Sequence, residues 1–226
     1  MSGHPTPPKK IVILVLAMAI TLITILIVVF RPFGGMRERG MQVPGDLMGA
    51  LLPFQKPLTD FQLTDHQGKA FTLARLQNQW TLLFFGYTHC PDVCPMALGF
   101  LGEVFTHLGK DPFGKTKLQG VFVSVDPKRD SLELLKDYVA FFNPEFLGAT
   151  GPEPMLKDLA QQVGAYYAIN PGGTDDAYEV SHSSAFFMIS PQGNLVGVVS
   201  PNNNTPDQVA EKIKRIVQYL GHGEKP

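Results

Sequence analysis

The longest run of apolar positions in the chain lies close to its N-terminus. Residues 11–30 read IVILVLAMAITLITILIVVF and contain no charged side chain. At ~1.5 Å of rise per residue, a helix of this length spans ~30 Å, the thickness of the hydrocarbon core of a bilayer. The run is longer than the ~7–15 apolar residues of a cleaved signal peptide. The pattern therefore predicts a transmembrane anchor over 11–31, preceded by a tail over 1–10.

The segment after the anchor has no sustained period of apolar positions. Residues 32–57 contain five glycines and four prolines. Such a composition is typical of a flexible linker rather than of a helix or strand. We therefore expect a linker over 32–57, one folded domain over 58–221 and a short tail over 222–226.

The first half of the folded domain reads as a hairpin followed by a strand, a helix and a second strand. Alternating apolar and polar positions predict short strands at 60–65 and 70–73, joined by a turn. The continuous apolar run WTLLFF at 80–85 is typical of a central strand that is buried on both faces. We expect a helix at about 93–108 and another buried strand, LQGVFVSVD, at 118–126.

The second half continues the alternation of helices and strands. We expect a helix over 131–142, in which Asp130 and Glu133 are spaced as a capping box. The later elements are a short strand at 146–149, a helix at 155–163, a hairpin of strands at 185–189 and 195–199, and a final helix that Thr205 caps. This order predicts an α/β fold with a thioredoxin-like mixed sheet flanked by helices.

Composition excludes several other classes of protein. The 226 residues include 19 basic and 20 acidic side chains, a formal net charge of −1, which gives no basic excess for nucleic-acid binding. Hydrophobic residues make up 44% of the chain, and there are two cysteines. These values exclude a disordered chain and a disulfide-dense secreted scaffold.

Both cysteines lie where an α/β sheet places its chemistry. Cys90 and Cys94 belong to the segment FGYTHCPDVCP, which joins the buried strand at 80–85 to the next helix. Ligands of open α/β sheets bind outside the carboxyl ends of the strands. Because Pro95 has no N–H, it must lie in the first turn of that helix, with Asp92 as a natural N-cap. We expect the positive end of the helix to lower the pKa of the nearby thiols.

The three residues between the cysteines leave more than one function open. The loop can close a disulfide, it can hold two sulfurs around one soft metal ion, or the thiols can be purely structural. A soft site with two thiolates needs another ligand, and histidine is the usual one for copper or zinc. His182, in the segment VSHSS before an apolar strand, is the best placed of the six histidines, although a surface or capping role is also open. The others are His4, His66, His89, His107 and His222.

Asp126 ends the predicted strand at 118–126 and so lies at the same edge of the sheet as the cysteines. A carboxylate in this position can orient a metal ligand or a proton. It can equally be a plain turn residue before Pro127.

Three segments together resemble the SCO/SenC family: GYTHCPDVCP, SVDPKRDS, and SHSS before a hydrophobic strand. The resemblance covers about residues 57–220. It implies a membrane-anchored copper protein with a thioredoxin-like fold, in which Cys90, Cys94 and His182 bind one copper ion as Cu(I) or Cu(II). Many members have aspartate before the ligand histidine, whereas this chain has Ser181.

The resemblance also implies partners and a location. Family members assist assembly of the dinuclear copper centre of cytochrome c oxidase subunit II by copper delivery, by reduction of the target's cysteines, or by both. The expected partners are therefore subunit II, a copper donor chaperone and a thiol reductant. Basic residues on both sides of the anchor leave its orientation open. The resemblance places the domain in the periplasm on the inner (cytoplasmic) membrane, or in the intermembrane space on the mitochondrial inner membrane of a eukaryote.

Metal binding and disulfide formation exclude each other, because a disulfide between Cys90 and Cys94 removes both thiolates. The alternative function is a metal-independent thiol–disulfide reductase or peroxidase-like enzyme that uses the same two cysteines. Nucleotide binding is not expected, although residues 109–116 read GKDPFGKT, the letters of a phosphate-binding P-loop. That motif needs a strand before it and a helix after it, and here the predicted order is reversed.

Overall fold

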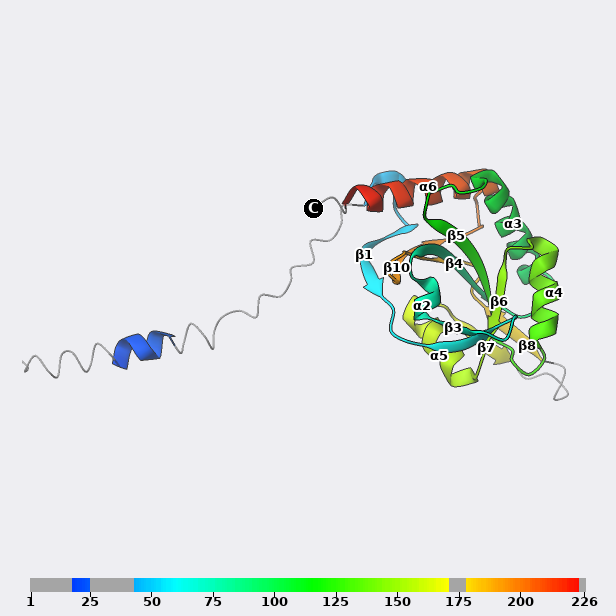
Figure 1. Ribbon diagram of the computed structural model, residues 1–226, viewed down its shortest axis with the longest axis horizontal. Coiled ribbons are helices and arrows are strands. Elements are labelled where there is room, and N and C mark those ends of the chain that lie inside the picture. Colours follow the sequence, from blue (N-terminus) through cyan, green and yellow to red (C-terminus); the bar gives the residue numbers. More distant parts are fainter. Residues whose placement is uncertain (1–17, 25–42, 171–177, 224–226) are drawn as a thin grey trace, which may run out of the picture. The chain divides into compact units, whose positions relative to one another are not determined.

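The computed structural model describes residues 18–24, 43–170 and 178–223, with side chains up to residue 221 (Figure 1). The chain divides into two compact units, residues 1–40 and 41–226. In the first unit, residues 18–24 are helical. No helix within the described residues is long and apolar enough to cross a membrane. The rest of the predicted anchor at 11–31 lies outside the described residues, so the anchor stays a prediction.

The second unit begins earlier than the sequence predicts. Within the expected linker at 32–57, a 3₁₀ helix forms at Gly45–Leu47 (η1) and a strand at Leu51–Pro57 (β1). The linker prediction is therefore wrong from residue 43 onward. The prolines of this segment argued against a strand, but proline is tolerated on an edge strand. The strand β1 is the edge of the main sheet. Gly197 on the neighbouring strand allows this approach: a Cβ there would lie 2.5 Å from the carbonyl oxygen of Ala50.

The main sheet has eight strands in the order β1-β10-β9-β4-β5-β6-β2-β3. Its central strands β4, β5 and β6 are parallel, and β9 runs antiparallel to β4. The strands that follow β1 are Gln62–Asp65 (β2), Ala70–Thr72 (β3), Gln79–Gly86 (β4), Lys117–Ser124 (β5), Leu147–Thr150 (β6), Phe186–Ile189 (β9) and Asn194–Val199 (β10). The predicted mixed sheet is confirmed, and β4 is buried from Trp80 to its end.

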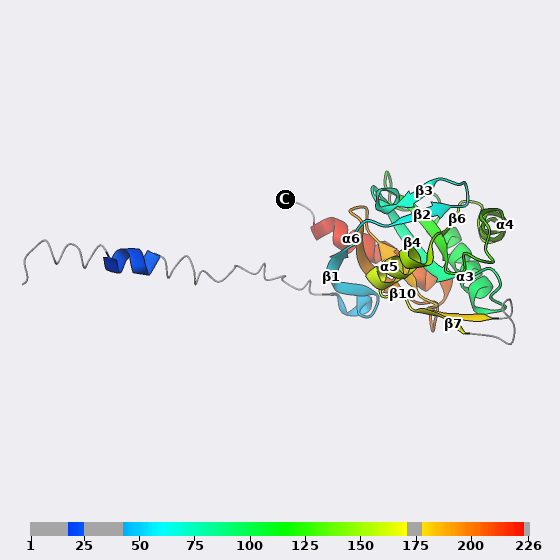
Figure 2. The same ribbon diagram turned by 90° about the horizontal axis from the view of Figure 1, so that it is seen from below.

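Helices flank this sheet, as predicted. Figures 1 and 2 show α3 and α6 close together, and the two helices are in contact. The helix α4 packs against β6 and α5 against β2. The helices are Leu73–Leu76 (α2), Val93–Leu108 (α3), Leu132–Phe142 (α4), Glu153–Val163 (α5) and Pro206–Gly223 (α6).

Two helix starts test the predicted caps. At α6, Thr205 and Gln208 are spaced as a capping box, and half of it forms: the backbone N–H of Thr205 donates to Oε1 of Gln208 at 3.0 Å, while the Thr205 hydroxyl donates to Asp207. At α4, the cap is Ser131, whose Oγ accepts the N–H of Leu134 at 3.1 Å. The capping role predicted for Asp130 is therefore wrong, and its carboxylate points to other partners.

A second, two-stranded sheet was not predicted. Its strands Tyr167–Asn170 (β7) and Glu179–His182 (β8) pair antiparallel, with Tyr167 opposite His182. Residues 171–177, which connect them, lie outside the described residues. His182, the only histidine predicted as a ligand, is the last residue of β8, so this small sheet determines its position.

We expect stability to fall below about pH 6.5 because of His66, in the turn between β2 and β3. Its Nδ1 accepts the backbone N–H of Gly148 at 3.0 Å, and burial lowers the pKa of its ring. Protonation would turn this acceptor into a donor, so the folded chain resists it. Stability is therefore full above the unfolded pKa and falls as the pH drops through that value toward the lower folded pKa.

The measurement is the urea midpoint at pH 8 and at pH 5.5. The His66→Asn chain cannot titrate at this position and should lose less stability between the two values than the wild type. His107→Asn, at an exposed position of α3, is the control and should behave as the wild type. Equal losses in all three chains would contradict the prediction.

Candidate metal centre

The two cysteines lie between β4 and α3, at the carboxyl end of a central strand. Cys90 is half-buried in the loop, and Cys94 lies in the first turn of α3 with 0% of its surface exposed. The backbone N–H of Cys94 donates to Sγ of Cys90 at 3.4 Å. Both cysteines are free thiols in this structure.

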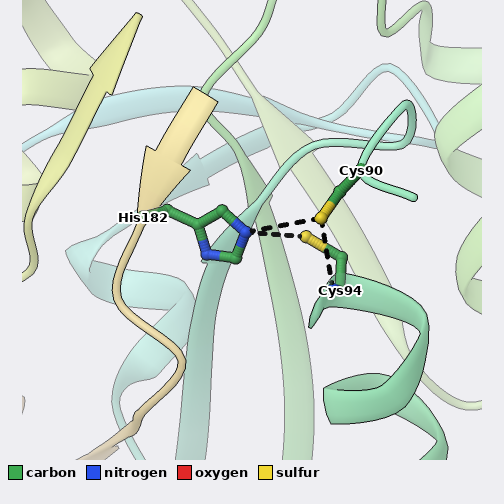
Figure 3. A group of neighbouring side chains, drawn as sticks. All are labelled: Cys90, Cys94 and His182. Carbon is green, nitrogen blue, oxygen red and sulfur yellow. Dashed lines mark hydrogen bonds between the residues drawn. The ribbon is translucent and has the colours of Figure 1, made fainter. Parts of the chain in front are cut away.

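His182 faces both sulfurs from the end of β8 (Figure 3). Its Nε2 lies 3.0 Å from Sγ of Cys94 and 3.8 Å from Sγ of Cys90. The three candidate ligand atoms all lie within 4.8 Å of one another. The structure thus brings together the three residues that the sequence singled out, although 88 residues separate the histidine from Cys94.

The tautomer of His182 suits a metal ligand. Its Nδ1 lies 3.1 Å from the carbonyl oxygen of Ser183, which can only accept, so Nδ1 holds the ring proton. The lone pair of Nε2 then points at the sulfurs. Burial lowers the pKa of the ring, which keeps it neutral at pH 7. The rings of Phe84 and Tyr87 pack edge-on against it, at centroid distances of 5.8 and 6.0 Å.

The expected effect of the helix on the thiols is reversed for Cys94. Burial raises the pKa of the Cys94 thiol well above its usual range. Asp92 occupies the N-cap position of α3, but its side chain makes no capping hydrogen bond. Desolvation therefore outweighs the positive end of the helix. A metal ion that binds here must displace the proton of Cys94.

Gly86, the last residue of β4, makes room for the buried sulfur. A Cβ at this position would lie 2.6 Å from Sγ of Cys94 and 2.8 Å from the ring of Phe122. Both atoms belong to groups that are themselves packed in the core. The position of the sulfur therefore depends on the absence of a side chain at residue 86.

Replacing Gly86 by alanine should displace the Cys94 sulfur and destabilise the fold by about 1–3 kcal/mol, the usual cost of overpacking a core. Urea unfolding gives the loss of stability, and competition with a Cu(I) chelator gives the accompanying loss of metal affinity. The matched control is Gly99→Ala in α3, where an added Cβ meets no atom within 4 Å. That change should stabilise the helix by up to ~1 kcal/mol. A Gly86→Ala chain with wild-type stability and affinity would show that the contact is relieved without consequence.

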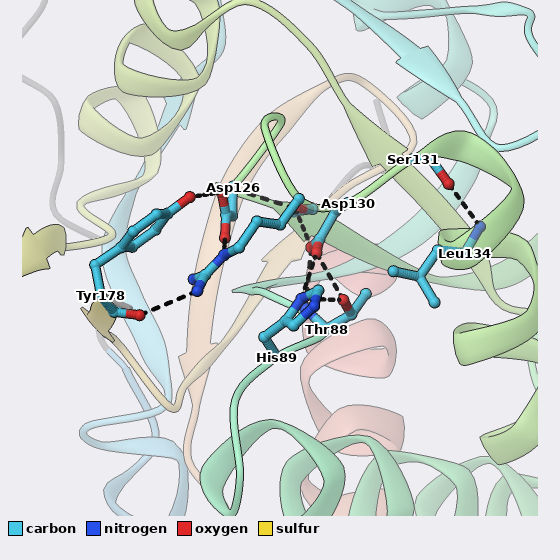
Figure 4. A network of polar contacts seen from close by, with 9 residues as sticks. Thr88, His89, Asp126, Asp130, Ser131, Leu134 and Tyr178 are labelled. Atoms are coloured by element: carbon cyan, nitrogen blue, oxygen red, sulfur yellow. Dashed lines mark hydrogen bonds and ion pairs between the residues drawn. The ribbon is translucent and has the colours of Figure 1, made fainter. Parts of the chain in front are cut away.

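Asp126 bonds to Arg129 and Tyr178, two residues that are not candidate ligands (Figure 4). Its Oδ1 accepts the hydroxyl of Tyr178 at 2.5 Å, and its Oδ2 accepts Nε of Arg129 at 2.5 Å. Tyr178 comes directly before β8, so Asp126 is linked to His182 through the backbone of that strand. Burial, with the nearby Asp126 adding to it, raises the pKa of Tyr178 to about 12, so the hydroxyl stays a donor.

Asp130 is a residue of the site that the sequence argument missed. Its buried carboxylate accepts the backbone N–H of Thr88 at 2.9 Å and the hydroxyls of Thr88 and Ser124, each at 2.6 Å (Figure 4). Nδ1 of His89 lies 3.4 Å from the same carboxylate. Asp130 therefore fastens the loop that leads to Cys90. The available signal was a second carboxylate in the segment SVDPKRDS at the same edge of the sheet.

An open recess of about 400 Å³ gives access to the centre. Residues of the cysteine loop and of β8 line it: Tyr87, Cys90, Pro91, Asp92, Val93, Glu179, Val180, Ser181 and His182. Cys90 and His182 can thus be reached from outside, while Cys94 lies behind them. The P-loop letters at 109–116 lie elsewhere, after α3 and before β5, in the reversed order that the sequence predicts.

The chain has a thioredoxin-like sheet, with two thiols and an imidazole together at the carboxyl end of a central strand. These features place it in the class of thioredoxin-like domains with a metal-binding cluster. Within that class, the chain belongs to the SCO1/SenC family, whose family model matches residues 53–218.

Individual relatives agree with this membership. The human protein SCO2 homolog, mitochondrial, is 36% identical over 156 residues, which are 69% of this chain and 58% of that protein. The chain therefore matches less than two thirds of this relative's length. The structure of Bradyrhizobium japonicum ScoI with copper bound is 35% identical, with a TM-score of 0.63, and the match covers 71% of this chain and 99% of that chain. Arabidopsis thaliana ScoI with copper bound is 31% identical, with a TM-score of 0.64 over 71% of this chain and 97% of that chain.

Proposed function

We propose that this chain binds one copper ion through Cys90, Cys94 and His182 and assists assembly of the dinuclear copper centre of cytochrome c oxidase subunit II. The observation that supports this best is the convergence of two sulfurs and one imidazole nitrogen within 4.8 Å at the end of a recess. Relatives of 31% and 35% identity have been solved with copper bound. Membership of the SCO1/SenC family supports the link to oxidase assembly.

The donor set fits copper chemically. Thiolate sulfur is a soft ligand that selects Cu(I), and a neutral imidazole suits either copper oxidation state. Cys90, Cys94 and His182 would hold the copper ion, which would supply a soft Lewis acid at this site. The chain's own residues prepare the site: the Ser183 carbonyl holds the ring proton on Nδ1, and Asp130 fixes the loop before Cys90.

Reduction of target cysteines is a second candidate role for the same two thiols. Cys90 is half-buried and lines the recess, while Cys94 is buried behind it. This suits an attacking and a resolving thiol, respectively. Attack by Cys90 on a target disulfide forms a mixed disulfide, and Cys94 then displaces the target. The target gains two electrons and two protons as Cys90 and Cys94 become a disulfide, which a thiol reductant must reduce again.

We propose that the domain acts outside the cytoplasm, held at the inner membrane by the predicted anchor at 11–31 and supplied by a copper donor chaperone. The mitochondrial and rickettsial SCO2 relatives support a periplasmic or intermembrane-space location. The test is labelling of Cys90 in intact cells or mitoplasts with a membrane-impermeant thiol reagent after reduction. Labelling only after lysis of the inner membrane would refute this location.

The functional test is complementation of a strain that lacks this chain. The wild type should restore copper in subunit II and oxidase activity, whereas His182→Ala should not. His107→Ala, at an exposed position of α3, is the control and should behave as the wild type. Full oxidase activity with His182→Ala at normal protein levels would refute the copper-dependent role and leave reduction by the dithiol as the remaining function.

A further inference from the structure

We infer that Asp126, Arg129 and Tyr178 form a positioning device, the Tyr178 clasp, which fixes β8 and thereby holds His182 opposite the two cysteines. This inference rests on the proposed function and deepens it. It assigns these three residues the task of setting the metal site's geometry without touching the metal ion.

The clasp holds Tyr178 at its hydroxyl, its ring and its backbone. The hydroxyl donates to Oδ1 of Asp126 at 2.5 Å (Figure 4). The guanidinium carbon of Arg129 lies 3.6 Å from the centroid of the tyrosine ring, and Nη1 donates to the backbone carbonyl of Tyr178 at 3.1 Å. Nε of Arg129 donates to Oδ2 of Asp126 at 2.5 Å, so each of the three residues bonds to the other two. Tyr178 is therefore fixed in both position and orientation.

Because Tyr178 lies directly before the strand that ends at His182, fixing Tyr178 also fixes the start of that strand. Tyr178 immediately precedes β8, which is four residues long and, among the strands that the structure describes, pairs only with β7. A two-stranded sheet by itself is marginally stable at best, so β8 depends on contacts beyond β7, such as the packing of the buried Val180 in the core. The far end of β8 is tied down because Ser183 donates its backbone N–H to the carbonyl of Tyr166 at 2.9 Å. The clasp secures the near end, so His182 lies on a strand that is anchored on both sides.

Arg129 also links the histidine strand to the cysteine segment. Its guanidinium carbon lies 5.6 Å from the ring centroid of Tyr87, which precedes Cys90 by three residues. The ring of Tyr87 in turn packs edge-on against His182. One guanidinium thus contacts an aromatic ring on each side of the site. Arginine suits this role because its planar group stacks on rings and donates in a fixed fork, whereas lysine presents a single point charge.

A metal-free measurement tests the clasp first, on the reduced full chain. Tyr178→Phe keeps the ring over Arg129 but removes the hydroxyl bond to Asp126. We expect amide hydrogen exchange of residues 179–182 to become about fivefold faster or more, the change that loss of one hydrogen bond produces. The matched control is Tyr167→Phe, in the neighbouring strand. Within the part of the chain that the structure describes, the Tyr167 hydroxyl is buried and has no hydrogen-bond partner.

Copper binding provides the second measurement, with Cu(I) and Cu(II) added as the simple ions. Tyr178→Phe should weaken Cu(I) binding by about tenfold or more, as expected for a change behind the ligands of a metal site. It should also shift the sulfur-to-Cu(II) charge-transfer band, which a uniform loss of stability would not do. Tyr167→Phe should keep both the wild-type affinity and the wild-type band. If Tyr178→Phe fails to fold, Arg129→Lys provides the same test with the charge on Asp126 still balanced.

The outcomes separate this inference from the proposed function. A wild-type chain that binds no copper refutes the proposed function, and the exchange data alone then decide whether the clasp holds β8. A wild-type chain that binds copper, with wild-type exchange, affinity and spectrum in both Tyr178→Phe and Arg129→Lys, refutes the clasp and leaves the proposed function intact. Faster exchange in β8 together with weaker binding, absent from Tyr167→Phe, supports the inference.

Discussion

Replacing His182 by alanine is expected to lower the affinity of the reduced chain for Cu(I) by about 100-fold or more, beyond the ~10–100-fold that changes behind a metal ligand cost. Nε2 of His182 is the nitrogen that lies 3.0 and 3.8 Å from the two sulfurs, and its lone pair faces them. The two thiols remain, so the variant should still cycle between dithiol and disulfide.

Competition with a chromophoric Cu(I) chelator measures this loss, and titration with a thiol reagent before and after oxidation checks that the dithiol survives. Because the imidazole packs against Phe84 and Tyr87, the variant's unfolding must be measured as well. His107→Ala serves as a control for the loss of a histidine. A His182→Ala chain that is folded and binds Cu(I) as tightly as the wild type would exclude this residue as a ligand.

Oxidation of the two cysteines is expected to abolish copper binding completely and reversibly. The structure places the sulfurs in one cluster, so each thiolate can serve either a disulfide or a metal ion. The oxidised chain should bind close to zero copper, and treatment with a thiol reductant should restore one ion per chain. The proton held by the buried Cys94 should be released when the metal binds, because burial raises the pKa of that thiol.

The control for this experiment is the Cys90→Ser chain, which cannot form the internal disulfide. Mild oxidant should leave its weakened copper binding unchanged. The exclusion of metal by the disulfide is wrong if the oxidised wild type, with no free thiol by titration, still binds copper in a stoichiometry near one.

Local patterns predicted the parts of the fold whose cause is local. The apolar run at 80–85 predicted the buried strand β4, and the position of Pro95 predicted that α3 begins just after the loop of Cys90. The thioredoxin-like sheet followed from the order of such segments. His182 was singled out by its place before an apolar strand and by the family resemblance. The structure brings its Nε2 to the sulfurs.

Other features depend on contacts between distant segments and could not be predicted from local spacing. The carboxylate of Asp130 meets Thr88 from 42 positions away, so its spacing to Glu133 misleadingly suggested a helix cap. The strand β1 was hidden by its prolines, which are harmless because β1 is an edge strand. The strands β7 and β8 are only four residues each and flank a polar, glycine-rich stretch, so their alternation was too short to detect.

The central claim, a copper site made of Cys90, Cys94 and His182, is tested most directly by metal analysis of the reduced full chain. The chain is loaded with excess Cu(I) under anaerobic conditions, separated from free metal, and analysed for copper per protein. The proposed site predicts one copper ion per chain, bound tightly enough to survive the separation. A stoichiometry near zero in a folded, fully reduced chain would contradict it.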